Sequence, residues 1–343
     1  MACRPCPRSK RTSIGVKNRE PEGNLVEHVK KMIIDADTGI DDALAILYAL
    51  KSPSIKVEGI TTVFGNISVD RATDNTLRII RLAQAPYDVP VVRGAAQPLE
   101  RGMPEFATHV HGMNGIGDAE IPPSSQEALS ERADDFIIRK SKELEGELIV
   151  VTLGRLTNLA LAVTKEPDLA KRIKHVYVMG GAVSVPGNVT PVSEANIWGD
   201  PEAADIVFTS GLPVTMVGLD VTMKTLLTGQ HLDQLMRFRQ EGNSEVIDFI
   251  RESHRYYFDF YRTSNSFIDA APIHDPLTVL VAEDPSLVTI QRMKVSVVCD
   301  SELCAGMTVA DLRRRSLAGT DIAVCTDVNA SLAVDRLLSP FVS

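Results

Sequence analysis

Short apolar runs alternate with longer helical patterns along most of this chain of 343 residues. Runs rich in β-branched residues predict strands at 32–34, 55–64, 89–92, 148–153, 176–179 and 214–217. Segments with helical periodicity or strong helix formers follow most of them, at 43–50, 68–84, 126–144, 156–162 and 201–208. This alternation predicts a Rossmann-like α/β fold, with a largely parallel central sheet and helices on both faces.

The C-terminal part departs from this simple alternation. The pattern there predicts helices over 228–262, 273–282 and near 327–338, and strands over 287–298 and 320–325. No internal repeat and no linker is visible after residue 30. We therefore expect a single domain over 29–343, with extra C-terminal helices and strands.

The first residues have a different composition. Residues 1–23 contain six Arg or Lys and three Pro but few apolar residues, and they lack the apolar core of a secretory signal. We expect residues 1–28 to form a disordered basic extension.

The totals exclude several classes of protein. A net charge of −9 argues against a nucleic-acid binder, and no apolar run approaches the roughly 20 residues of a membrane span. The apolar content of 44% is enough for a sizeable core. The five cysteines are an odd number, which favours reduced thiols and a cytoplasmic location.

The clearest chemistry lies in a cluster of acids behind the first predicted strand. Asp35, Asp37, Asp41 and Asp42 fall within eight positions, between the carboxyl end of that strand and the start of a helix. Ligands of open α/β sheets bind at this end of the strands. Two carboxylates about 4 Å apart repel by roughly 1 kcal/mol in water and by several times that in a partly dry cleft. The cluster therefore needs a compensating interaction.

Three interactions could compensate. Negative charge near a helix start is favourable by about 0.3–1 kcal/mol, which suits Asp41 and Asp42 but leaves Asp35 and Asp37 unexplained. An arginine from elsewhere in the chain could relieve the repulsion in such a capped turn. A bound hard cation, Ca²⁺ or Mg²⁺, accounts for all four acids, and we expect a metal site for that reason.

The acidic stretch resembles the first motif of the inosine–uridine-type nucleoside hydrolases, D-x-D-x-G-x-D-D. The family usually has Pro where this chain has Thr38, at a position that shapes the turn and binds no ligand. Further family motifs follow in order between about residues 31 and 326. They are Thr61-Thr62-Val63-Phe64-Gly65-Asn66, His109-x-His111-Gly112, Gly154-Arg155-Leu156-Thr157-Asn158, Met179-Gly180-Gly181, Gly187-Asn188, Glu194-Ala195-Asn196, Asp200-Pro201-Glu202-Ala203-Ala204, His274-Asp275-Pro276 and Gly306-Met307-Thr308-Val309-Ala310-Asp311.

The resemblance implies Ca²⁺-dependent hydrolysis of the N-glycosidic bond of ribonucleosides to free base and ribose, as in nucleoside salvage. The ion would be held by Asp37, Asp42, Asp275 and the backbone carbonyl of Leu153, where the family often has Thr. A water molecule and two sugar hydroxyls would complete the coordination. Ligation by oxygen alone is what Ca²⁺ prefers.

The resemblance also implies catalytic roles. Asp37 would be the general base, Asn66 would lie beside the attacking water, and His274 would protonate the leaving base. A histidine that only positions Asp275 is the alternative for His274. The acid-rich pocket would stabilise an oxocarbenium-like transition state.

The substrate contacts follow from the same resemblance. They comprise Asp41 at the 2′-hydroxyl, Asn196 and Asp275 at the 3′-hydroxyl, Asn188 and Glu194 at the 5′-hydroxyl, Met179 in the substrate pocket and His111 in the base pocket. His111 could instead stabilise its loop. Tyr257 and Tyr261 share one helix face and either border the base or pack in the core.

Two other functions stay open from the sequence. A Mg²⁺-dependent phosphatase of the haloacid-dehalogenase type also opens with a strand and alternate aspartates, but it needs Thr or Val where this chain has Gly39. A non-catalytic nucleoside or ribose binder would use the same carboxylates without turnover. The base preference is left open, and the family resemblance predicts a homodimer or homotetramer.

Overall fold

The strands of the molecule confirm the predicted fold class. The computed structural model describes Met1 and residues 29–313 and 318–342, so the predicted extension over residues 1–28 lies outside the described residues except for Met1. The strands are β1 (Lys30–Ala36), β2 (Ile55–Thr62), β3 (Val91–Arg93), β4 (Leu148–Thr152), β5 (His175–Met179), β6 (Val214–Val217), β7 (Leu226–Thr228), β8 (Ala270–Pro272), β9 (Val288–Val297), β10 (Thr308–Ala310) and β11 (Thr320–Val328).

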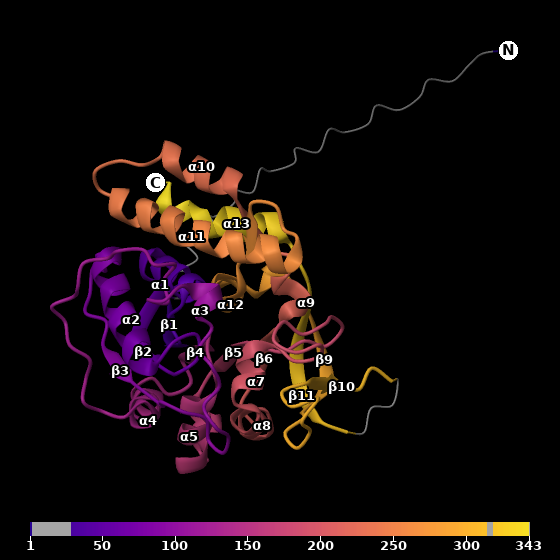
Figure 1. Ribbon diagram of the computed structural model, residues 1–343. Helices are drawn as coiled ribbons and strands as arrows, with labels where there is room; N and C mark the ends of the chain where they lie inside the picture. The colour runs from indigo at the N-terminus through magenta and orange to yellow at the C-terminus, as the bar shows by residue number, and fades with distance from the viewer. Residues whose placement is uncertain (2–28, 314–317, 343) are drawn as a thin grey trace.

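A nine-stranded sheet runs through the described residues in the order β10-β9-β11-β6-β5-β4-β1-β2-β3 (Figure 1). The strands from β3 to β6, together with β11, pair in parallel, whereas β9 is antiparallel to both of its neighbours. The chain adds β2 and β3 on one side of β1 and then returns to add β4, β5 and β6 on the other. The strand order therefore reverses between β1 and β4, where a crevice opens at the carboxyl edge in this fold class.

Helices cover both faces of the sheet (Figure 1). One face is covered by α1, α2, α11, α12 and α13, and the other by α4, α5 and α8. The helices are α1 (Ile40–Lys51), α2 (Val69–Ala83), α3 (Thr108–His111), α4 (Ala133–Glu143), α5 (Thr157–Lys165), α6 (Leu169–Arg172), α7 (Ala195–Gly199), α8 (Pro201–Thr209), α9 (Leu219–Thr222), α10 (Gly229–Arg237), α11 (Ser244–Asn265), α12 (His274–Glu283) and α13 (Ala330–Leu338).

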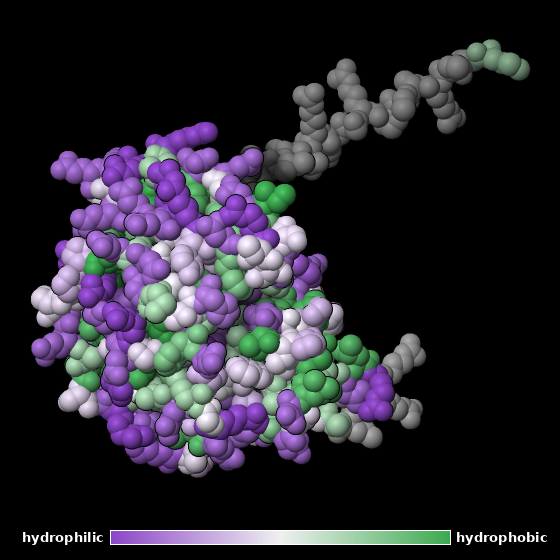
Figure 2. Space-filling view, in the orientation of Figure 1, coloured by the Kyte–Doolittle hydropathy of each residue, from purple (hydrophilic) through white to green (hydrophobic). Residues whose placement is uncertain are grey.

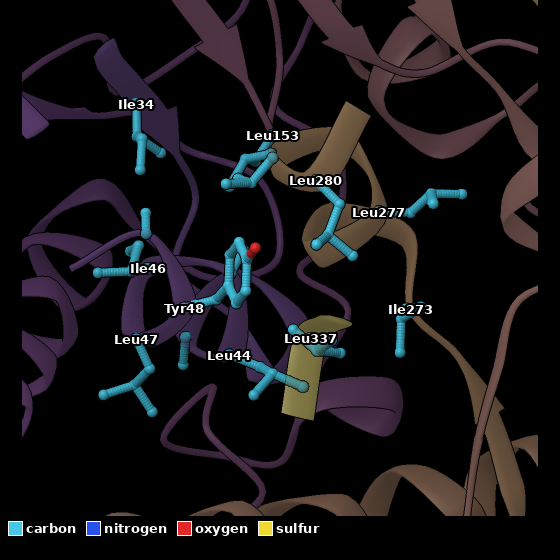
Figure 3. Close-up of a cluster of buried hydrophobic side chains, with 14 of the residues drawn as sticks. Ile34, Leu44, Ile46, Leu47, Tyr48, Leu153, Ile273, Leu277, Leu280 and Leu337 are labelled. Carbon is cyan, nitrogen blue, oxygen red and sulfur yellow. The ribbon is translucent and has the colours of Figure 1, made fainter. Parts of the chain in front are cut away.

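The apolar residues of β1 explain why the sheet is buried on both sides. Met32 and Ile34 belong to the core on one face, and Ile33 belongs to the core on the other. Successive side chains of a strand point to opposite faces, so an unbroken apolar run supplies both cores. Figure 3 shows part of the first core, where side chains of α1, α12 and α13 gather around Tyr48. This packing fixes the starts of α1 and α12, which carry the acids of the site.

Several boundaries differ from the prediction. The helix predicted over 126–144 begins only at Ala133, because Leu129 forms a bridge beside β3 and its N–H donates to the Val91 carbonyl. The helical stretch predicted over 228–262 is two helices, α10 and α11, separated by a turn in which the Asn243 side chain bonds to the backbone of Phe238 and Gln240. The short pair β7–β8 was not predicted from the sequence.

The visible surface is mainly hydrophilic, and apolar side chains gather on it near β9 and β10 (Figure 2). Leu303, Val309 and Leu312, in and around β10, are among the exposed apolar residues. None of the described helices combines the length and hydropathy needed to cross a membrane.

Candidate active site

The four residues predicted to bind the metal all lie at the carboxyl edge, where the strand order reverses. Asp37 follows β1, Asp42 lies in the first turn of α1, Leu153 follows β4, and Asp275 lies in the first turn of α12. All four are buried. The Asp42 carboxyl lies close to the carboxyl groups of both Asp37 and Asp275. The fold thus gathers carboxylates that are distant in the sequence.

Asp41 joins this group, which we call the acid cluster (Asp37, Asp41, Asp42 and Asp275). In the group whose carboxylate oxygens all lie within 4.8 Å of one another, Asp41 accompanies Asp42 and Asp275, in the place that the prediction gave to Asp37. The Oδ1 atoms of Asp37, Asp41 and Asp42 are buried and accept no hydrogen bond from any described residue. Buried acceptors of this kind are costly unless a cation or a donor fills the space between them.

Burial and mutual repulsion make the charged forms of the cluster unfavourable. Burial, together with the neighbouring Asp42 carboxyl, raises the pKa of Asp37 to about 8. Burial likewise raises the pKa of Asp41 to about 7 and that of Asp42 to about 6. The pKa of Asp275 lies well above its usual range because of burial and the neighbouring Asp41 and Asp42.

The donor set of the cluster fits a hard cation. It consists of carboxylate oxygens, three of them without a hydrogen bond, with the Leu153 backbone at the same edge. Carboxylate oxygens of Asp41, Asp42 and Asp275 lie no more than 4.8 Å apart, and two oxygens that bind one Ca²⁺ at 2.3–2.6 Å can be separated by up to about 5 Å. One ion could therefore contact oxygens on opposite sides of the group.

Asn66 bridges two acids of the cluster, and its predicted place beside the reacting water remains a proposal. Its backbone N–H donates to Asp37 Oδ2 at 2.7 Å, and its side-chain Nδ2 donates to Asp42 Oδ2 at 3.2 Å. Asp37 Oδ2 also accepts from Arg155 Nη1 at 2.5 Å. One oxygen of Asp37 is therefore anchored by two donors, while the other is left without one.

Asn196 links the predicted sugar contacts to the end of β4. Its Nδ2 donates to the Leu153 carbonyl at 2.6 Å and to the Met179 carbonyl at 3.2 Å, and it lies 3.3 Å from Met179 Sδ. Its Oδ1 accepts from Arg155 Nη1 at 3.1 Å. A carbonyl oxygen has two lone pairs, so the bond from Asn196 leaves Leu153 able to contact an ion as well.

Glu194 is buried and its carboxylate binds backbone N–H groups, whereas Asn188 is exposed. The Glu194 carboxylate caps α7 by accepting from the N–H groups of Asn196 and Ile197 at 2.9 and 3.1 Å, and it also accepts from Gly181 N–H at 3.0 Å. Asn188 Oδ1 accepts from Ala195 N–H at 3.0 Å. Both residues hold the loop that carries Asn196, and their predicted contact with the 5′-hydroxyl remains a proposal.

His274 lies between two hydroxyl groups. Its Nδ1 is 2.8 Å from Thr222 Oγ1 and its Nε2 is 2.8 Å from the Tyr261 hydroxyl. Burial lowers the pKa of His274 to about 4. The rings of Tyr261 and Tyr257 meet edge to face at 5.0 Å, and the Tyr257 hydroxyl donates to Asp41 Oδ2 at 3.2 Å. Both tyrosines are buried, and a chain of polar groups runs from His274 to the acid cluster.

His111 is tied to the start of α1. Its Nδ1 accepts from the Ile40 N–H at 3.1 Å, and burial, with Arg155 nearby, lowers its pKa to about 3. Its ring lies 5.7 Å from that of Tyr257. The hydrogen bond to Ile40 supports the loop-stabilising role, and the position beside Tyr257 also places His111 next to the site.

Sequence reasoning did not identify two groups of the site. Arg155 was quoted only as part of a motif, although an arginine was among the possible explanations of the acidic cluster. Thr222 carried no signal, because a single threonine after a strand is common in this fold. Asp35 lies outside the acid cluster, where its Oδ1 accepts from Thr61 at 2.5 Å and from Asn158 at 2.8 Å.

Comparisons with known proteins show what the chain is similar to. Residues 32–335 match the family model described as inosine-uridine preferring nucleoside hydrolase. The chain is 39% identical to uridine nucleosidase 1 of Arabidopsis thaliana over 289 residues, or 84% of each protein. A purine-preferring ribonucleoside hydrolase from Gardnerella vaginalis aligns with a TM-score of 0.85 and 37% identity over 91% of this chain and 98% of its own. A plant nucleoside hydrolase, PpNRh1, aligns with a TM-score of 0.85 and 36% identity over 92% of this chain and 99% of its own.

Proposed function

The chain belongs to the inosine-uridine preferring nucleoside hydrolase family, and we propose that it is a Ca²⁺-dependent enzyme that cleaves ribonucleosides to free base and ribose. The family and the relatives make it a ribonucleoside hydrolase, as predicted, and they favour neither the phosphatase nor the non-catalytic binder. The observation that carries the Ca²⁺ proposal is the acid cluster, in which three buried carboxylate oxygens accept no hydrogen bond from the described residues.

The proposal gives the residues of the site the roles that the resemblance implies. Asp37, Asp42, Asp275 and the Leu153 carbonyl would hold the ion. When bound, Ca²⁺ would lower the pKa of the attacking water and hold it close to the sugar. Asp37 would accept the proton of that water through Oδ1, since Oδ2 is held by Asn66 and Arg155.

The sugar would be held by hydrogen bonds to its hydroxyl groups. Asp41 would accept from the 2′-hydroxyl, because its Oδ1 has no donor among the described residues. Asp275 and Asn196 would bind the 3′-hydroxyl, and Met179 would line the substrate pocket beside Asn196. Glu194 and Asn188 would bind the 5′-hydroxyl. Together the carboxylates would stabilise the positive charge that develops on the sugar ring.

The leaving base would receive its proton from His274 through the Tyr261 hydroxyl, which is 2.8 Å away. A buried histidine with a pKa of about 4 is a strong acid once it is protonated, although little of that form exists at neutral pH. His111 and Tyr257, whose rings are 5.7 Å apart, would border the base.

We also propose a cytoplasmic homodimer or homotetramer with one catalytic domain over residues 29–343. The described cysteines, Cys299, Cys304 and Cys325, are free thiols, as expected in a reducing compartment. The exposed apolar residues Leu303, Val309 and Leu312 near the sheet edge supply a surface for a second copy. Cell fractionation, light scattering of the purified chain and limited proteolysis test these three proposals separately.

The central experiment is a panel of nucleosides assayed for released reducing sugar, with and without a chelator. We expect ribose release from at least one of inosine and uridine, loss of that release in chelator and recovery with added Ca²⁺. Undiminished release by thoroughly metal-stripped enzyme would contradict the Ca²⁺ proposal. The same panel measures the base preference, on which the named relatives differ, since one is a uridine nucleosidase and another prefers purines.

A further inference from the structure

Arg155 is a buried cation next to the acid cluster. The residue is 5% exposed, and its Nη1 donates to Asp37 Oδ2 at 2.5 Å and to Asn196 Oδ1 at 3.1 Å. Among the described residues, no other Lys or Arg lies within ion-pair distance of an acid of the cluster. A single guanidinium therefore faces several buried carboxylates.

The surrounding backbone leaves space for this side chain. A Cβ atom on Gly65 would lie 2.4 Å from Arg155 Nη1, and one on Gly199 would lie 2.5 Å from its Nε. Both distances are too short for any residue larger than glycine, and a Cβ atom on Gly65 would also lie 1.9 Å from Asp37 Oδ2. The two glycines therefore leave room for Arg155 to reach Asp37 Oδ2.

The ion pair of Arg155 with Asp37 affects the binding of any cation to the acid cluster. Arg155 neutralises part of the charge on Asp37 and places its own positive charge beside a group that would bind Ca²⁺. In a buried site with a low effective dielectric constant, charges of the same sign a few ångströms apart repel strongly. The metal-free site is stabilised by the same contact, because a buried oxygen of Asp37 then has a charged hydrogen-bond donor.

We propose that Arg155 is a positioning residue that sets the Ca²⁺ affinity of the site, acting as an internal cation that stabilises the metal-free form and weakens the binding of the ion. This inference rests on the proposed Ca²⁺ dependence. It concerns a residue that does not itself ligate the ion or take a proton from the substrate.

The test is a calorimetric titration of the metal-stripped full-length chain with CaCl₂. Removing the charge in Arg155→Met should tighten Ca²⁺ binding by about tenfold or more. The same variant should melt at a lower temperature than the parent in chelator, and added Ca²⁺ should raise its melting temperature by more. Arg155→Gln repeats the test with a donor that has no charge, in case the Met variant does not fold.

Two further variants separate charge from structure. Arg155→Lys keeps the positive charge and should bind Ca²⁺ with nearly the parent affinity. Arg101→Met removes a partly buried arginine paired with Glu202, away from the cluster, and should leave the Ca²⁺ affinity unchanged. Unchanged or weaker Ca²⁺ binding by folded Arg155→Met or Arg155→Gln overturns the inference while leaving the proposed function intact. Absence of Ca²⁺ binding by the parent chain overturns both.

Discussion

The acid cluster predicts that the metal-free protein loses stability as the pH rises, and that Ca²⁺ restores it. Asp37 shows the direction of the effect. Its pKa is raised from an ordinary value of 3.8 to about 8 in the folded chain, mainly by burial. The folded state thus binds a proton that the unfolded state has already released. The stabilisation is fully present below about pH 4 and is lost as the pH rises through about 8.

The size of the effect follows from the same two values. One pKa unit corresponds to about 1.4 kcal/mol, so Asp37 alone removes roughly 6 kcal/mol of stability once the pH exceeds about 8. Asp41 and Asp42 act in the same direction, with pKa values of about 7 and about 6. Whole domains are stable by only about 5–15 kcal/mol, so the metal-free form should become marginal above neutral pH.

Thermal unfolding in chelator and in saturating Ca²⁺, measured between about pH 5 and pH 8, tests this prediction. We expect the melting temperature of the metal-free form to fall with pH, and the gap between the two curves to widen. The Asp37→Asn variant should show a flatter metal-free curve, because it lacks the most shifted of the titrating groups with a stated pKa. Asp205→Asn is the matched control. Burial also raises the pKa of Asp205, but this residue lies outside the cluster.

Two results would refute the reasoning. The first is a metal-free melting temperature that does not change between about pH 5 and pH 8. The second is a Ca²⁺ stabilisation of the same size at both pH values. Either would mean that the buried carboxylates do not exchange protons for the ion.

Three further predictions concern turnover. Asp37→Asn should lower kcat by about 10³-fold or more in the reducing-sugar assay, and a variant that keeps parental turnover would remove Asp37 as the base. 2′-Deoxyribonucleosides should show a kcat/KM about 10⁴-fold below that of the ribonucleosides, since Asp41 would lose its partner; comparable values would contradict that contact. Tyr261→Phe should slow natural nucleosides by about 10²-fold but p-nitrophenyl riboside only slightly, because that leaving group needs no proton; equal losses on both would indicate a structural role for Tyr261.

The fold was predictable where local pattern and tertiary packing agree. The apolar run of β1 is buried on both faces, and the helix formers after it give α1, which is buried along nearly all its length. The prediction failed where strand pairing or a side-chain hydrogen bond determines the structure against the local hydrophobic pattern. Leu129 forms a bridge to Val92 at the sheet edge instead of starting a helix, and Asn243 donates to the Phe238 carbonyl in the turn between α10 and α11. These contacts depend on partner residues that the periodicity of apolar residues in a short stretch of sequence does not show.

The site was predictable to the extent that its residues carry a motif. The resemblance named the acids, Asn66 and His274, and the structure brings all of them to one edge of the sheet. It did not predict that the two ring nitrogens of His274 form hydrogen bonds with Tyr261 and Thr222. Hydroxyl groups are abundant and carry no spacing signature, so only the fold shows which of them reach His274.

The pairing of β1 with β4 explains why the contact of Arg155 with Asp37 was hidden in the sequence. Asp35 is paired with Thr152, so the residues that follow each strand leave the sheet side by side, although Arg155 and Asp37 are 118 positions apart. From the sequence, an arginine and a bound cation were alternative ways to relieve the repulsion among the acids. In the structure, Arg155 and Asn66 donate to Oδ2 and no described residue donates to Oδ1, so a bound cation would use a different oxygen of Asp37 from the arginine. The two explanations therefore combine: the guanidinium holds the carboxylate in place, and the other oxygen is left for the proposed ion and for the proton of the water.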